Sequence, residues 1–86
     1  MNVEVEVSYL VRKFVQVELT EALFRELYNK YKNSALSRMM ILDEICEYLE
    51  QESGYIAADG QELEYDTDIE SWVLDMYEKV RKEEEY

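Results

Sequence analysis

Residues 2–19 read NVEVEVSYLVRKFVQVEL, and apolar and polar side chains alternate along most of this stretch. Valine dominates the odd positions, while glutamate recurs at the even ones. A period of two with β-branched residues is typical of strands that bury one face. One strand of that length would be unusually long. The stretch therefore predicts an antiparallel β-hairpin that turns near Tyr9–Lys13, where Leu10 and Phe14 interrupt the polar face.

A helix is predicted directly after the hairpin. Thr20 can cap its N-terminus, with Leu19 and Phe24 placed as a hydrophobic staple around the cap. Apolar residues then recur at intervals of three and four through about Lys32, which indicates one buried stripe. The stripe consists of Leu23, Phe24, Leu27, Tyr28 and Tyr31.

A second helix is predicted to begin at Ser34 or Ser37 and to run to about Ser53. Gly54 would end it, because glycine readily adopts the left-handed conformation of a helix C-cap. The expected inner face consists of Met39, Leu42, Cys46 and Leu49, widened by Ile41, Ile45 and Tyr48. The outer face would carry acidic residues, as described below.

The segment after Gly54 contains Asp59–Gly60, a pair that suits a type I′ turn between two short strands. Such a hairpin would pair Ile56 with Leu63, and a loop carrying the same turn is the alternative. Thr67 and Glu70 then form a capping box for a last helix. Its core stripe would be Ile69, Trp72, Val73, Met76 and Val80, and we expect residues 83–86 to be a frayed tail.

These elements predict a single α+β domain over residues 1–86: a hairpin, two helices, a short Asp-Gly hairpin or turn, and a C-terminal helix. A chain of this size can bury one modest core. The only cysteine, Cys46, excludes an internal disulfide framework. Its inward helical position and acidic neighbours favour a buried thiol with a raised pKa.

The composition argues against catalysis and against a bound cofactor. Histidine is absent, so the commonest neutral-pH acid/base and metal ligand is missing. The acids from Asp59 to Glu70 are hard ligands suited to Ca²⁺ or Mg²⁺. With Asp66 as loop position one, however, Ser71 and Tyr77 replace the required glycine and glutamate. We therefore expect no enzyme activity and no dedicated metal site.

Charge is distributed unevenly along the chain, whose net charge is −12. Residues 43–86 carry most of the acidic side chains, while residues 1–42 are close to neutral. Such a charge repels anionic lipid and nucleic acid, so no direct nucleic-acid or membrane binding is expected. The favoured partner is a protein with a basic groove, and the expected location is the cytoplasm. Solubility is the alternative reason for the acidity.

Carboxylates three or four residues apart lie together on a helix, and their repulsion costs a few tenths of a kcal/mol per pair. Tyrosines lie between the acids and supply the contact area that interfaces favour. The predicted partner-binding face combines the second helix with the segment that follows it. Its acids are Asp43, Glu44, Glu47, Glu50, Asp59, Glu62, Glu64, Asp66 and Asp68, and its possible aromatic contacts are Tyr48, Tyr55 and Tyr65.

In size, acidity and α+β character the chain resembles the small inhibitors of bacterial defence encoded by phages and mobile elements. Anti-CRISPR proteins and DNA-mimic anti-restriction proteins are the examples. The resemblance is one of composition over the whole chain, without a family motif. It implies a protein that binds a nuclease, or a CRISPR or restriction complex, and blocks the access of DNA. The alternative is an assembly protein, such as a homodimer formed by edge pairing of the N-terminal strands.

Overall fold

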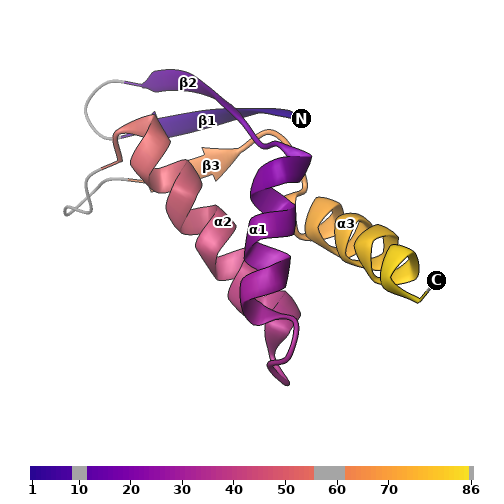
Figure 1. Cartoon of the computed structure of the whole chain (residues 1–86). Helices are drawn as coiled ribbons and strands as arrows, with labels where there is room; N and C mark the ends of the chain where they lie inside the picture. Colours follow the sequence, from indigo (N-terminus) through magenta and orange to yellow (C-terminus); the bar gives the residue numbers. More distant parts are fainter. Residues whose placement is uncertain (9–11, 56–61, 86) are drawn as a thin grey trace.

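The computed structural model describes residues 1–8, 12–55 and 62–85, and the fold is α+β as predicted (Figure 1). Three strands form one sheet, and three helices accompany it. The described elements are β1 (Asn2–Ser8), β2 (Lys13–Glu18), α1 (Glu21–Tyr31), α2 (Ser37–Ser53), β3 (Glu62–Tyr65) and α3 (Ile69–Glu84).

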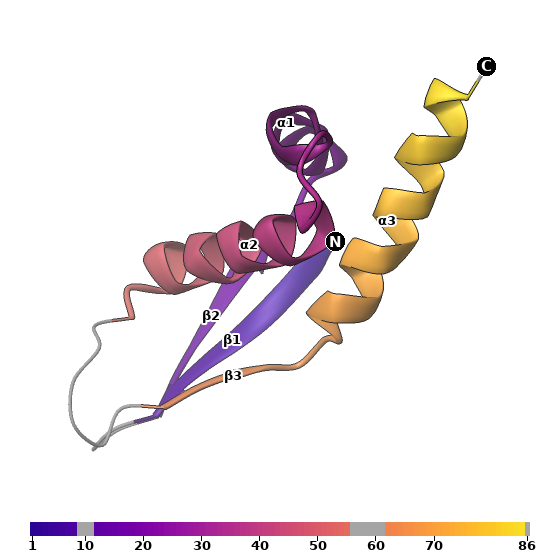
Figure 2. The same cartoon turned by 90° about the horizontal axis from the view of Figure 1, so that it is seen from below.

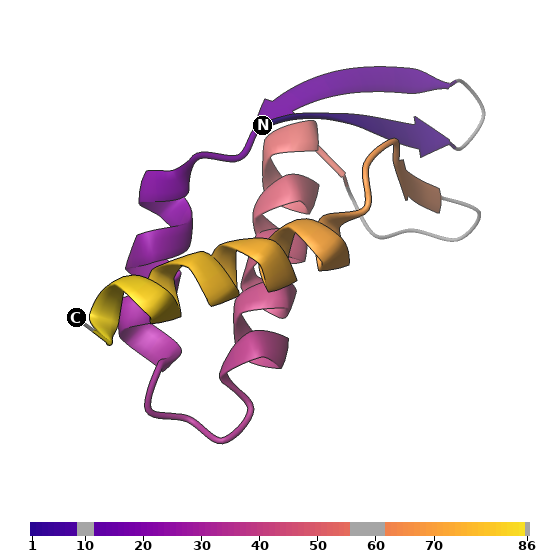
Figure 3. The same cartoon turned by 90° about the vertical axis from the view of Figure 1, so that its right-hand side faces the viewer.

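The sheet has the order β2-β1-β3, and both of its pairings are antiparallel. This confirms the N-terminal hairpin; residues 9–11 of its connection lie outside the described residues. Val5 faces Val15 on one side and Tyr65 on the other, so odd positions share one face of the sheet. The three helices lie on the side of that face (Figures 1 and 3). The alternation in residues 2–19 therefore separates a covered face from an open one.

Strand β3 pairs with β1, the central strand, which is distant from it in sequence. Asp66 prolongs this pairing beyond β3: its N–H donates to the Glu4 carbonyl at 3.1 Å, and its Oδ1 accepts the Glu4 N–H at 2.9 Å. Ile56 and the Asp59–Gly60 turn lie outside the described residues. The pairing of Ile56 with Leu63 stays a prediction.

Helix α1 begins as predicted. Thr20 Oγ1 accepts the N–H of Leu23 at 3.1 Å, which satisfies one of the free donors of the first turn. Leu19 and Phe24 are both almost completely buried, as the hydrophobic staple requires. Phe24 and Tyr28 from the predicted stripe are buried, while Leu23, Leu27 and Tyr31 pack against the core from its margin.

The core lies between the covered sheet face and the helices (Figure 2). Helix α2 contributes Ile41, Ile45 and Leu49, which are spaced by four residues and are fully buried. The predicted inner face was partly wrong, because Met39 is 61% exposed. The buried line of α2 runs through Ile41, Ile45 and Leu49, and Met39 lies on another side of the helix. Gly54 ends the helix with a φ of 75°, as predicted.

Helix α3 is capped by Asp68 and not by Thr67, so the predicted capping box was wrong by one residue. Asp68 Oδ1 accepts the N–H of Ser71 at 3.1 Å, and the helix begins at Ile69. The Thr67 hydroxyl instead donates to Asp66 Oδ1 at 2.9 Å. Asp68 itself has an extended backbone, with φ −73° and ψ 94°, so the first helical residue is Ile69.

This correction has a direct test. We expect Asp68→Ala to lower the free energy of unfolding by about 1 kcal/mol, because it leaves the Ser71 N–H without its cap. Thr67→Ala is the matched control, and its effect should stay within about 0.5 kcal/mol. Urea denaturation of both variants, followed by circular dichroism, makes the comparison. A larger loss for Thr67→Ala would support the capping box instead.

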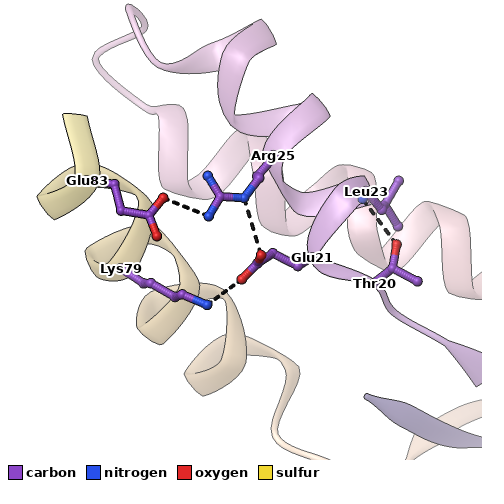
Figure 4. Close-up of polar contacts among 6 residues, drawn as sticks. All are labelled: Thr20, Glu21, Leu23, Arg25, Lys79 and Glu83. Atoms are coloured by element: carbon purple, nitrogen blue, oxygen red, sulfur yellow. Dashed lines mark hydrogen bonds and ion pairs between the residues drawn. The ribbon is translucent and has the colours of Figure 1, made fainter.

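Helices α1 and α3 are joined by ion pairs along their exposed sides (Figure 4). Arg25 Nη2 lies 2.7 Å from Glu83 Oε2, and Lys79 binds Glu21. The hydrogen bond from Lys79 lowers the pKa of the Glu21 carboxyl. The predicted frayed tail was wrong for Glu83 and Glu84, since α3 continues through Glu84. The Tyr28 hydroxyl donates a hydrogen bond to Glu84 Oε2, with 2.9 Å between the two oxygens.

Candidate functional site

None of the described helices covers the outer face of the sheet, opposite the face that packs on the core (Figure 3). The strand sequences place a group of acidic side chains on this open face. Even-numbered residues occupy this face, opposite the buried valines. Glu6 in β1 is at the centre of the group, in register with Phe14 of β2 on one side and Glu64 of β3 on the other. The acidic sheet face, as we define it, comprises Glu4, Glu6, Glu18 and Glu64 together with Phe14 and Gln16.

Two of these carboxylates have polar partners within the face. Gln16 Nε2 donates to Glu4 Oε2 at 2.8 Å across the strands. Arg12 Nε lies 3.3 Å from Glu6 Oε1, and the Arg12 side chain is 77% exposed. Glu18 and Glu64 are exposed and belong to none of the ion pairs found among the described residues. The face therefore keeps a clear excess of negative charge.

Phe14 is the large aromatic side chain that this face presents to solvent, with 56% of its surface exposed. Apolar rings surrounded by polar groups are the usual anchors of protein interfaces. The sequence predictions missed this face, because the acids at even positions served only to identify strands. The usable signal was Phe14 itself, an aromatic residue in a position where the alternation calls for a polar one.

The predicted acidic stripe on α2 exists, but it belongs to a different surface. Asp43 and Glu47 are exposed and Glu50 is half-buried. Asp43 and Glu47 lie on the side of α2 opposite the buried Ile45, so they and the acidic sheet face point in different directions. Glu50 instead lies toward Tyr65 of β3. Glu44 is not part of this stripe. Its Oε1 accepts a hydrogen bond from the Tyr31 hydroxyl at 2.7 Å and lies 4.0 Å from Lys30 Nζ.

The acids predicted after Gly54 also have different roles. Glu64 belongs to the acidic sheet face, whereas Asp66 is bonded to the backbone of Glu4 and Asp68 caps α3. Asp59 and the side chain of Glu62 lie outside the described part of the chain. The structure therefore does not gather the predicted partner-binding residues on one face.

The tyrosines proposed as aromatic contacts lie at the margin of the core. Tyr48, Tyr55 and Tyr65 are half-buried and pack against it. Tyr65 is close to Cys46, whose thiol pKa is raised first by burial and then by Asp43 and Glu50. The direction agrees with the sequence prediction for Cys46. A thiol with a raised pKa holds little thiolate at neutral pH and is a poor nucleophile.

The raised pKa values of two tyrosine hydroxyls lead to a prediction for stability at alkaline pH. Burial, aided by the bond to Glu84, raises the pKa of Tyr28 to about 12, and burial likewise raises that of Tyr65 to about 12. Because an unfolded tyrosine has a pKa near 10, the folded state holds these protons more tightly. Stability from this source is complete below about pH 10 and is lost as pH rises toward about 12.

Urea midpoints measured across this alkaline range provide the test. Tyr28→Phe should make the decline shallower, because one of the two shifted groups is gone. An equal decline in the wild type and the variant would show that Tyr28 does not contribute.

A groove lies between the first half of α2 and α3, apolar near Met39 and Leu74 and more polar toward Ser34 and Arg81. One hollow of about 280 Å³ is lined by Arg38, Met39, Leu42, Glu70, Val73 and Leu74. A second of about 440 Å³ continues from it past Leu36 to Tyr77 and Arg81, and the two share Arg38 and Met39. Its wall includes Tyr77, whose hydroxyl is 2.8 Å from that of buried Ser37. We call this surface the α2–α3 groove.

Neither surface has the make-up of a metal centre. The described residues contain no group of three or more cysteine, aspartate or glutamate side chains able to hold a metal ion. In the same part of the chain, no helix combines the length and apolar character needed to cross a bilayer. No family model, no curated protein and no solved structure matches the chain.

Proposed function

We propose that the protein is a non-enzymatic inhibitor that binds, through its acidic sheet face, a basic groove built for nucleic acid. The partner class is a nuclease or a CRISPR or restriction complex in the cytoplasm of a bacterial host. The observation that carries the proposal is the position of Glu6, which has an exposed phenylalanine on one side and a second glutamate on the other.

The pair formed by Glu6 and Glu64 supports a binding role. Glutamates directly opposite each other on neighbouring strands repel, and such a pair destabilises a sheet. Arg12 offsets only part of this repulsion, because it is itself largely exposed. A basic partner would relieve it on binding, so the cost borne by the free protein favours the complex.

The spacing of the acids suits binding to a partner surface that normally recognises phosphates. Glu4 and Glu6 are two residues apart on one strand, which separates their Cβ atoms by about 7 Å, and neighbouring strands are about 4.8 Å apart. Carboxylates at such separations present a flat array of negative charge to arginine and lysine side chains. Phe14 adds an apolar contact that an array of phosphates alone would lack.

Several cations of the chain are engaged away from this face. Arg25, Lys32 and Lys79 form the ion pairs between α1 and α3. Arg12 is the one cation seen to pair with an acid of the sheet face among the described residues. Most of the negative charge of the acidic sheet face is therefore left without an ion pair among the described residues.

A capture experiment tests the proposal. The tagged protein would be incubated with nuclease-treated bacterial lysate at low salt and then eluted in a salt step. We expect release of a nucleic-acid-binding protein, because contacts between exposed charges weaken with ionic strength. Purified partner should then bind either duplex DNA or this protein, but not both. Simultaneous binding of DNA would contradict mimicry.

A further inference from the structure

The α2–α3 groove exposes apolar side chains that the proposed function does not use. Among the described residues, six large hydrophobic side chains are exposed, and Leu36, Met39 and Leu74 line this groove. They are 59%, 61% and 43% exposed, respectively. The buried or half-buried Val73 and Leu42 extend the apolar surface inward. A clustered apolar surface of this kind indicates an interaction site.

The charges around the groove differ from those of the rest of the molecule. Arg38 and Glu70 line the first hollow, and Arg38, Glu78 and Arg81 line the second. The groove is therefore close to neutral on a chain of net charge −12. Two copies of the chain repel each other less here than through either of their acidic surfaces.

The groove also carries charges of both signs on opposite walls. Arg38 belongs to α2, where its guanidinium lies 6.0 Å from the centre of the Tyr77 ring, and Glu70 belongs to the first turn of α3. In a two-fold dimer each copy presents the same patch, so the patch must complement itself. A surface with apolar residues between an arginine and a glutamate meets this requirement.

We infer that the α2–α3 groove binds a second copy of this chain in a two-fold symmetric homodimer. The apolar side chains of the two copies pack together, and Arg38 of each copy faces Glu70 of the other. The protomer is elongated, with extents of 51 × 22 × 17 Å and a radius of gyration of 14.3 Å. A compact chain of this length has a radius near 12 Å. Pairing along the groove covers the exposed Leu36, Met39 and Leu74 of both copies. The open sheet face remains free in this dimer.

Sedimentation equilibrium of the full chain over a range of concentrations tests the inference. We expect a mass of twice 10.4 kDa at high concentration. Salt should strengthen the dimer, because it screens the repulsion between two acidic copies. Binding through the acidic sheet face should instead weaken with salt, so the two proposals can fail separately.

Single substitutions in the groove identify the surface. Met39→Glu and Leu74→Glu should each raise the dissociation constant at least about tenfold, since each places a charge among apolar side chains. Phe14→Glu adds the same charge to an exposed apolar position outside the groove and should leave the dimer intact. Unchanged circular dichroism shows that all three remain folded.

A mixing experiment tests the symmetric pairing. Arg38→Glu and Glu70→Arg should each weaken the homodimer, and Glu52→Arg controls for the charge change of the latter. An equimolar mixture of the two groove variants should form a heterodimer, because their reversed charges complement each other across the interface. A wild-type monomer at every concentration and salt would overturn the inference. A dimer that survives Met39→Glu and Leu74→Glu would overturn it as well and would indicate pairing of strand edges.

Discussion

Phe24→Ala is expected to remove most of the stability of the fold. The Phe24 side chain is fully buried, and its ring meets the edge of Trp72 at a centroid distance of 5.8 Å and stacks near Tyr28 at 6.4 Å. It thereby joins α1 to α3. Truncation of a buried phenylalanine leaves a cavity and typically costs about 3–5 kcal/mol.

This loss is large in comparison with the total. Domains are stable by roughly 0.05–0.15 kcal/mol per residue, which gives about 4–13 kcal/mol for a chain of this length. Urea denaturation monitored by Trp72 fluorescence should show a much lower midpoint, or no folded baseline. Phe14→Ala removes the other phenylalanine of the chain, which is exposed, and should change stability by less than about 0.5 kcal/mol. Similar losses for both variants would contradict the described core.

Glu64→Lys is expected to make the protein more stable and less able to bind. Lysine opposite Glu6 replaces a repulsive cross-strand pair with an attractive one, which is worth about 0.2–1 kcal/mol. The same change removes one of the unpaired acids from the acidic sheet face and puts a positive charge beside Glu6, at the centre of that face. Affinity for the captured partner should fall at least about tenfold, which corresponds to 1.4 kcal/mol.

The control must change the net charge equally. Glu52→Lys does so at an exposed site in the last turn of α2, away from the sheet face. Titration calorimetry with the captured partner would compare the two variants, and thermal unfolding would supply their stabilities. Equal affinities for Glu64→Lys and Glu52→Lys would show that binding depends on net charge and not on the sheet face.

Much of the fold could be predicted because its signals are local. The period of two in residues 2–19, the cap at Thr20 and the left-handed turn at Gly54 each depend on residues close in sequence. Their physical causes, which are alternation, backbone bonding and steric freedom, act within one turn or one strand. Two local predictions failed. The buried side of α2 does not include Met39, and the N-cap of α3 is Asp68 and not Thr67.

The candidate site was harder to predict, because charge in the sequence does not reveal direction in space. Asp66 and Asp68 belong to the same acidic run as Glu64, yet one bonds to β1 and the other caps α3. Glu6 and Glu64 lie far apart in the chain and meet only because β3 pairs with β1. The strongest compositional signal lay in residues 43–86, whereas β1 and β2 supply most of the acidic sheet face.

The class of fold, most of the bounds of its elements and the inward-facing strand residues follow from the sequence alone. Hydrophobic periodicity and capping encode these features locally. The folded arrangement was needed to find which acids share a surface, which of them are used in capping and pairing, and that Met39 and Leu74 line one groove. The physical reason is that β3 and α3 take their positions through contacts with β1, α1 and α2, which are distant in sequence.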